Sequence, residues 1–168
     1  MRVAILTVSD SVMNRTRVDS SGQAIVEWCE RRGDQLMERA TVADDTSRIV
    51  PILSAWCDSG SIDLLLTTGG TGLSPRDVTP EATLAIIERE AQGIAEYLRA
   101  ASFVRFPRAA LSRGIAGVRG STLVINLPGS TTGVEDYLSA LDPVIDHAVA
   151  VLGGNTSHQD AGEEIAKK

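Results

Sequence analysis

Three loops that each follow an apolar run carry the residues of this sequence that could do chemistry. The longest reads TTGGTGLSPRDVTPEAT, from Thr67 to Thr83, and it contains three glycines and Asp77. Glycine permits a positive φ and lets a ligand approach the backbone closely. Successive backbone N–H groups before a helix attract an anion, and phosphate is the usual occupant. This loop therefore predicts a phosphate-binding edge.

The other two loops have a related composition. INLPGSTTG, residues 125–133, repeats the order of strand, polar side chain, glycine and helix start. TVSDSVMNRTRVDSSG, residues 7–22, follows the first apolar run. The glycine loops match neither G-x-x-x-x-G-K-[ST] nor G-x-G-x-x-G, so two tight turns without a ligand stay open as the plainer interpretation.

Four acidic residues stand directly after predicted strands or inside these loops, namely Asp10, Asp44, Asp45 and Asp77. Carboxylates beside phosphate-binding loops are what Mg²⁺-assisted phosphoryl or nucleotidyl transfer requires. One of the pair Asp44 and Asp45 is expected to cap a helix instead. Because no G-x-S-x-G elbow is present, we expect transfer by positioning and charge stabilisation without a covalent intermediate.

Hydrophobic patterns predict the elements that position these loops. Strands are expected at residues 2–9, 36–42, 62–68 and 121–127. Helices are expected from Ser20 or Ser21 to Arg32, from the Asp44–Ser47 segment, from Thr79, around 94–103 after Gly93, and over 134–152. Pro51 predicts either a late start or a kink in the second of these.

Alternating strands and helices predict an α/β fold, a three-layer sandwich in which a mostly parallel sheet carries helices on both faces. In such sheets the ligand crevice lies beyond the carboxyl ends of the strands. We expect one domain over residues 1–154 and a polar tail over 155–168.

Composition limits the classes of function. The chain has 168 residues and a net charge of −6, without a block of Lys or Arg, which argues against nucleic acid as a partner. No apolar run approaches the ~20 residues that span a membrane. The N-terminal apolar run is too short for a signal peptide, so we expect a cytoplasmic protein.

Cysteine and histidine are too sparse for a metal site of their own. Cys29 and Cys57 stand singly in predicted helices and are expected to be buried free thiols. His147 and His158 are the only histidines, which excludes a zinc site of several histidines.

TTGGTGLSPRDVTPEAT closely resembles the signature of the MoaB/Mog family of molybdenum-cofactor biosynthesis proteins. The likeness extends to VSDS and DSSG within residues 8–22, to ALSRGIAGVRGSTLVINLPGS at 110–130, and to ALDPVIDHAVAVLGG at 140–154. It covers residues 2–154 in consistent order, and its two long segments are highly specific.

The resemblance implies a molybdopterin adenylyltransferase that uses ATP, molybdopterin and Mg²⁺. It implies a homotrimer or a hexamer, and a downstream molybdenum-insertion protein as a partner. Asp44 and Asp77 map onto the family's two functional aspartates, as catalytic and metal-binding residues. The nucleotide is expected at Ser9, Asp10, Thr68, Gly69, Gly70, Thr71 and Gly72, and the pterin and its phosphate at Ser112, Arg113, Asn126, Pro128, Gly129 and Ser130.

Two other functions stay open on the sequence: a non-catalytic molybdopterin-binding module of the same family, and a scaffolding oligomer. The acidic loop reads VADD where the family often has VPDE, which predicts a less rigidly placed Asp44. No aspartate or loop glycine of the signature is missing, so we favour the enzyme.

Overall fold

The computed structural model describes residues 1–154; the tail predicted for 155–168, including His158, lies outside them. Its centre is a six-stranded sheet in the order β2-β1-β3-β6-β5-β4. The strands are β1 (Arg2–Val8), β2 (Gln35–Val42), β3 (Leu64–Thr68), β4 (Arg89–Glu90), β5 (Ala116–Arg119) and β6 (Thr122–Leu127).

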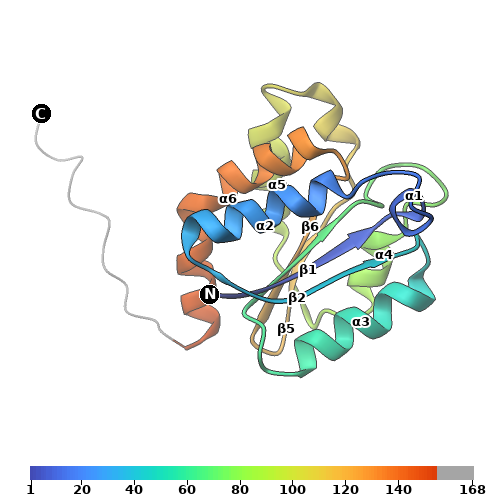
Figure 1. The fold of residues 1–168 in the computed structure, drawn as a ribbon. Helices are drawn as coiled ribbons and strands as arrows, with labels where there is room; N and C mark the ends of the chain where they lie inside the picture. The colour runs from blue at the N-terminus through green and yellow to red at the C-terminus, as the bar shows by residue number, and fades with distance from the viewer. Residues whose placement is uncertain (155–168) are drawn as a thin grey trace, which may run out of the picture.

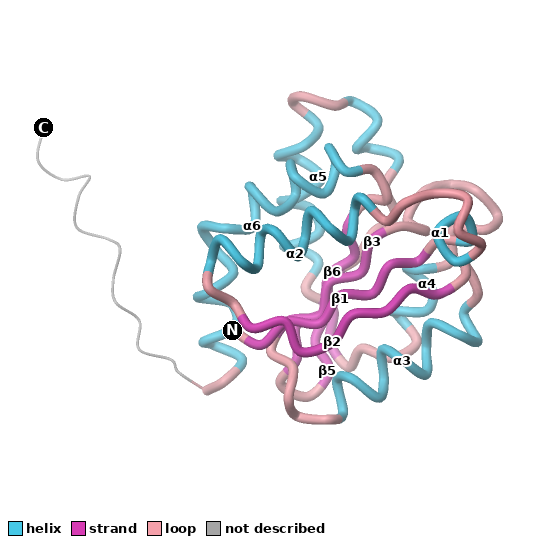
Figure 2. Tube along the Cα trace, viewed as in Figure 1, coloured by secondary structure: helices cyan, strands magenta, loops and turns pink. Residues whose placement is uncertain are grey.

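Helices cover both faces of this sheet (Figures 1 and 2). One face carries α2 (Ser20–Arg32), α5 (Gln92–Phe103) and α6 (Thr131–Leu152), and the other carries α3 (Thr46–Asp58) and α4 (Thr79–Leu84). The short helix α1 (Asp10–Met13) and a 3₁₀ helix, η1 (Pro107–Leu111), lie in loops. The predicted three-layer α/β sandwich is confirmed.

The four predicted strands form the parallel part of the sheet, since β1 pairs with β2 and β3, and β3 pairs with β6. The hairpin partner β5 and the two-residue β4 add antiparallel pairs that the sequence did not predict. Both strands are short, and β5 contains Gly117, so neither has a hydrophobic pattern of its own. Both are strands only by virtue of their hydrogen-bonded pairing with neighbouring strands.

The sheet separates two hydrophobic cores. Successive side chains of a strand point to opposite faces, so Val3 and Ile5 of β1 enter one core while Ala4 and Leu6 enter the other. Cys29 lies in the first core and Cys57 in the second. Both are buried free thiols, as predicted, and burial raises the pKa of each to about 11.

Two helix starts differ from the predicted ones. Asp19, not Ser20 or Ser21, caps α2, because its carboxylate accepts the Gly22 N–H at 2.8 Å. The helix α6 begins at Thr131 behind the cap Ser130, three residues earlier than predicted. Sequence patterns locate apolar stripes, whereas the hydrogen bond of the cap decides the first turn.

Pro51 and Gly93 both lie inside helices. The helix α3 starts at Thr46 behind the cap Asp45, so the late start, one of the two alternatives predicted from Pro51, is wrong. Gly93 is the second residue of α5. The N–H groups of the first turn of a helix have no carbonyl partner within the helix, so a flexible glycine there costs little helix stability. The strand β4 separates α4 from α5 instead.

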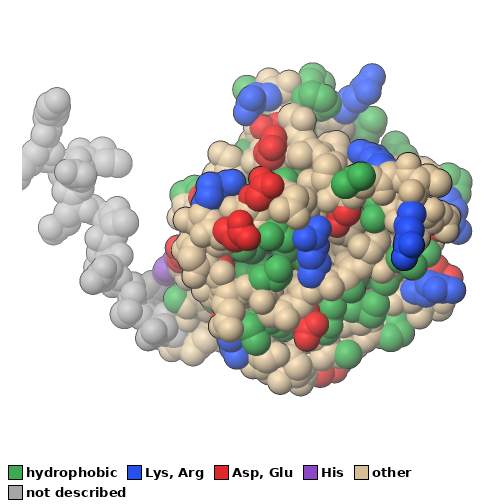
Figure 3. Space-filling model, in the orientation of Figure 1, with side chains coloured by type: hydrophobic (Ala, Val, Ile, Leu, Met, Phe, Trp, Pro, Cys, Tyr) green, Lys and Arg blue, Asp and Glu red, His purple; other side chains and the backbone are tan. Residues whose placement is uncertain are grey.

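The surface is of mixed charge. The face drawn in Figure 3 carries both basic and acidic side chains, with several acidic ones next to one another at its upper left. Within residues 1–154, no helix combines the length and the apolar character that crossing a membrane takes.

Candidate active site

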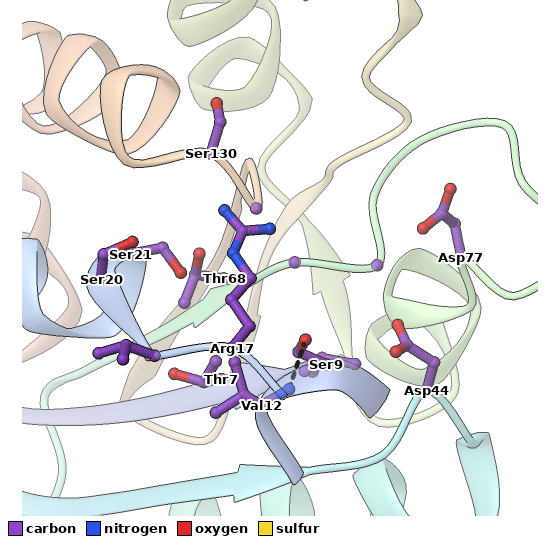
Figure 4. A pocket seen from close by; sticks show the side chains of 15 residues that line it. Thr7, Ser9, Val12, Arg17, Ser20, Ser21, Asp44, Thr68, Asp77 and Ser130 are labelled. Atoms are coloured by element: carbon purple, nitrogen blue, oxygen red, sulfur yellow. Dashed lines mark hydrogen bonds between the residues drawn. The ribbon is translucent and has the colours of Figure 1, made fainter. Parts of the chain in front are cut away.

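The site lies where the strand order reverses. From β1 the sheet continues to β2 on one side and to β3 on the other, so the loops that follow β1 and β3 diverge at the carboxyl edge. A cavity of about 330 Å³ opens there (Figure 4), which we call the first cavity. It is lined by Thr7, Val8, Ser9, Val12, Arg17, Val18, Ser20, Ser21, Asp44, Thr68, Gly69, Gly70, Asp77, Gly129 and Ser130.

The glycine loop after β3 closes one wall of this cavity. Gly69 and Gly70 have φ values of 97° and 62°. A Cβ on Gly69 would lie 2.2 Å from the Val8 carbonyl oxygen, and one on Gly70 would lie 2.4 Å from Thr79 Oγ1. Glycine suits both positions, because an added side chain would combine a φ that L residues rarely adopt with a close approach to a neighbouring atom.

Asp44 is held at the cavity by Asp10. The Asp10 N–H donates to Asp44 Oδ2 at 2.8 Å, and the Asp44 N–H donates to Asp10 Oδ1 at 3.2 Å. These reciprocal bonds hold Asp44 in place without the proline that the family often has before it. No hydrogen bond within residues 1–154 occupies Asp44 Oδ1, which lies 3.0 Å from where a Cβ of Gly70 would stand.

Charge differs between these two carboxylates. Asp10 pairs with Arg76 at 2.5 Å, and that hydrogen bond lowers the pKa of Asp10. Burial raises the pKa of Asp44, because a desolvated carboxylate is costly to ionise. The neighbouring Asp45 caps α3 by accepting the Ser47 N–H at 2.8 Å, which confirms that one of the pair is a helix cap.

Asp77 is fixed from its own loop. Its Oδ2 accepts the Ser74 N–H at 2.8 Å, and its backbone N–H donates to the Ser74 carbonyl at 2.9 Å. As with Asp44, no hydrogen bond in the described part of the chain occupies Oδ1 of Asp77. Two carboxylates, each anchored through one oxygen, thus line the same cavity.

A second cavity of about 430 Å³ adjoins the first. The two share Gly70, Asp77, Gly129 and Ser130. The rest of the second cavity is lined by Thr71, Gly72, Ser102, Phe106, Arg108, Ala109, Leu111, Ser112, Pro128, Gly133, Asp136 and Tyr137. Its aromatic and aliphatic walls suit a flat, partly apolar ligand, whereas the first cavity is more polar.

Most of the predicted site residues line one of these cavities. On the nucleotide side, Ser9, Thr68, Gly69 and Gly70 line the first cavity, but Thr71 and Gly72 line the second. On the pterin side, the second cavity contains Ser112, Pro128, Gly129 and Ser130. Asp10 lines neither and instead holds Asp44.

Two predicted pterin ligands have a structural role in this fold. Asn126 is 2% exposed, and its amide donates to Thr67 and Thr83 at 2.9 Å each while its oxygen accepts the Ile115 N–H. Arg113 donates to the backbone carbonyls of Gly72 and Asp77 and pairs with Glu81. Neither side chain lines either of the two cavities, and their assignment as pterin ligands stays a prediction.

Several lining residues were missed by sequence reasoning. Arg17 is the one basic side chain among the described residues that line the first cavity, and no hydrogen bond or ion pair within 1–154 engages its guanidinium. It extends into the cavity from the loop between α1 and α2 (Figure 4). The position of Arg17 in the first loop was only a weak indication of a role in the site. Ser102 and Tyr137 lie in helices, and nothing in the neighbouring sequence indicated that they line a cavity.

Comparison with known proteins places the chain in a family. Residues 4–147 match the family described as a probable molybdopterin binding domain. This chain belongs to that family. The MoaB/Mog resemblance is confirmed, since the molybdopterin biosynthesis enzyme MoaB of Thermus thermophilus is 45% identical and superimposes with a TM-score of 0.86. The superposition covers 91% of this chain and 96% of that one.

Other members of the family differ in size. A molybdopterin adenylyltransferase of Helicobacter pylori is 36% identical over 157 residues, which cover 92% of this chain and 89% of the relative. The molybdenum cofactor synthesis protein cinnamon of Drosophila melanogaster is 36% identical over 91% of this chain. The chain spans only about a quarter of the length of cinnamon and of a second long relative.

Proposed function

We propose that this MoaB/Mog-family chain is a molybdopterin adenylyltransferase in molybdenum-cofactor biosynthesis. An oxygen of the terminal phosphate of molybdopterin attacks the α-phosphorus of ATP, and the bond from that phosphorus to pyrophosphate breaks. The products are adenylylated molybdopterin and pyrophosphate. The name of the Helicobacter pylori relative supports this reaction, which needs two substrates held side by side.

One observation carries the proposal: two cavities meet at Asp77, and Asp44 faces the first of them. ATP occupies the first cavity, where the glycine loop receives its phosphates. Molybdopterin occupies the second, with its phosphate at the shared residues Gly129 and Ser130. The reacting oxygen and phosphorus then meet beside Asp77, so catalysis rests on positioning.

The donor set fits Mg²⁺. Asp44 and Asp77 are hard oxygen ligands with one unoccupied oxygen each, and Mg²⁺ typically takes one or two carboxylates together with substrate phosphates. Within residues 1–154, no group of three or more His, Cys, Asp or Glu gathers for a metal. These two aspartates would hold the ion together with the nucleotide, and its charge would stabilise the phosphates during transfer.

Other side chains position this machinery. Arg17 supplies a positive charge to an otherwise acidic first cavity, where it can pair with phosphate oxygens. Asp10 fixes Asp44, while Arg113 and Asn126 hold the loops in place. The proposal also includes a homotrimer or hexamer, a cytoplasmic location, and transfer of the product to a molybdenum-insertion protein, with no nucleic-acid or membrane partner.

Single-turnover release of pyrophosphate tests the function. The purified chain is mixed with ATP, Mg²⁺ and molybdopterin, and the wild type is expected to give a burst. Asp77→Asn should lower the rate by about 10²–10³, because it weakens the site of the Mg²⁺ whose charge would stabilise the transition state, and it should weaken pterin binding far less. Equal losses in rate and binding would contradict the role of Asp77.

Asp45→Asn is the matched control. It removes a carboxylate next to Asp44 that lines neither cavity, and asparagine caps a helix as well as aspartate does. Its burst should equal that of the wild type. Pterin binding without any pyrophosphate in the wild type would instead establish the non-catalytic binding module.

A further inference from the structure

Two buried hydroxyl groups of the second cavity have no hydrogen-bond partner in the described part of the chain. They are Ser102 Oγ on α5 and Tyr137 Oη on α6. Each residue is 3% exposed, and both line the cavity. A buried hydroxyl without a partner costs about 1–3 kcal/mol, so native proteins seldom keep one.

Other buried polar side chains of the described residues do form hydrogen bonds. Thr68, Thr79, Thr83, Thr122 and Asn126 are all buried, and each makes at least one hydrogen bond. Within residues 1–154, the buried side-chain atoms without a partner belong to Ser102 and Tyr137 alone. Both line the same cavity, which argues that the fold leaves them for a ligand.

The surroundings define the chemistry of that ligand. The ring of Tyr137 and the side chains of Phe106 and Leu111 give the cavity apolar walls. A hydroxyl can both donate and accept. Burial raises the pKa of the Tyr137 hydroxyl, while the neighbouring Ser112 hydroxyl in the same cavity wall lowers it. Apolar walls with two such hydroxyls suit a flat heteroaromatic ring whose edge carries both donors and acceptors.

We infer that Ser102 and Tyr137 recognise the polar edge of the heteroaromatic ring of a substrate, in the second cavity. On the proposed function, on which this inference rests, the ring is the pterin of molybdopterin. The adenine of ATP has the same kind of edge, and the experiment separates the two rings. Both residues bind substrate and determine specificity; neither takes part in the transfer.

Tyr137→Phe is the decisive variant, because it removes only the hydroxyl. Binding of molybdopterin and of ATP is measured separately by calorimetric titration, without turnover. Molybdopterin binding should weaken about tenfold, the loss typical of one buried hydrogen bond, and ATP binding should stay unchanged. The melting temperature of the ligand-free variant should be unchanged or higher, since no protein hydrogen bond is lost.

Tyr97→Phe is the control, because Tyr97 is the other tyrosine, is 42% exposed on α5, and lines neither cavity. Ser102→Ala should repeat the effect of Tyr137→Phe. Loss of ATP binding instead would assign the site to adenine and overturn the pterin assignment. Unchanged binding of both substrates would overturn the inference, and absence of turnover in the wild type would count only against the adenylyltransferase.

Discussion

The guanidinium of Arg113 ties the glycine loop to α4. It donates to the Gly72 carbonyl at 2.7 Å and to the Asp77 carbonyl, and it pairs with Glu81 at the start of the helix. The Arg113 backbone N–H also donates to the Thr71 carbonyl at 2.8 Å. Arginine suits this task because its planar fork presents several donors in fixed directions. The position of Asp77 therefore depends on a residue outside both cavities.

At the scale of single residues we predict that Arg113→Gln lowers the free energy of unfolding by about 1–2 kcal/mol without any substrate, because hydrogen bonds between a charged donor and partly buried carbonyls are lost. Chemical denaturation of the ligand-free protein measures this. Arg48→Gln, at an exposed position of α3, should have no such effect. Unchanged stability with weakened pterin binding would instead support Arg113 as a direct ligand.

The loop between β3 and α4 is the element on which the site depends. It reverses direction within a few residues, so that Gly70 passes next to both Thr79 and Asp44. The Thr79 hydroxyl donates to the Gly69 carbonyl at 2.8 Å, and the Thr79 N–H donates to the Gly70 carbonyl at 3.1 Å. Helix α4 and the loop thus stabilise each other.

Gly70→Ala should lower the free energy of unfolding by at least about 1–2 kcal/mol, since alanine is strained at a φ of 62° and its Cβ would lie 3.0 Å from Asp44 Oδ1. Pyrophosphate release should fall with it. Gly93→Ala is the control: a Cβ there meets no atom within 4 Å, so stability should stay the same or rise by up to about 1 kcal/mol. Thermal and chemical unfolding compare the two, and equal effects would rule out the geometric explanation.

Across the whole molecule, exposed apolar side chains gather where α5 ends. Phe103, Val104 and Phe106 are 51%, 85% and 52% exposed, values that are unfavourable for large apolar residues left in water. Exposed apolar patches of this kind commonly mark protein contacts. This surface is a candidate contact between subunits in the proposed trimer.

We predict a solution mass of three or six times the 17.8 kDa of one chain, measured by light scattering. Replacing Phe103 and Val104 together by aspartate should dissociate the assembly, because two charges would be buried without partners. A wild type that elutes with the mass of one chain would contradict the trimer. An assembly that survives the double substitution would place the interface elsewhere.

The sequence by itself determined the features that depend on local pattern. Apolar runs define β1, β2, β3 and β6, and the positive φ values of Gly69 and Gly70 can be met readily by glycine alone. Alternation of strands and helices brings the three loops to one edge of the sheet. The placement of Asp44 and Asp77 at one cavity follows from that topology.

Only the tertiary structure decided which side chains face the cavities. Asn126, in β6, and Ser130, at the start of α6, stand only four residues apart. The side chain of Asn126 is nevertheless occupied by three hydrogen bonds within the protein, whereas Ser130 lines both cavities. Tyr137 becomes part of the site because α6 packs beside α5. These outcomes depend on contacts between residues far apart in the sequence, and the type or spacing of neighbouring residues does not encode them.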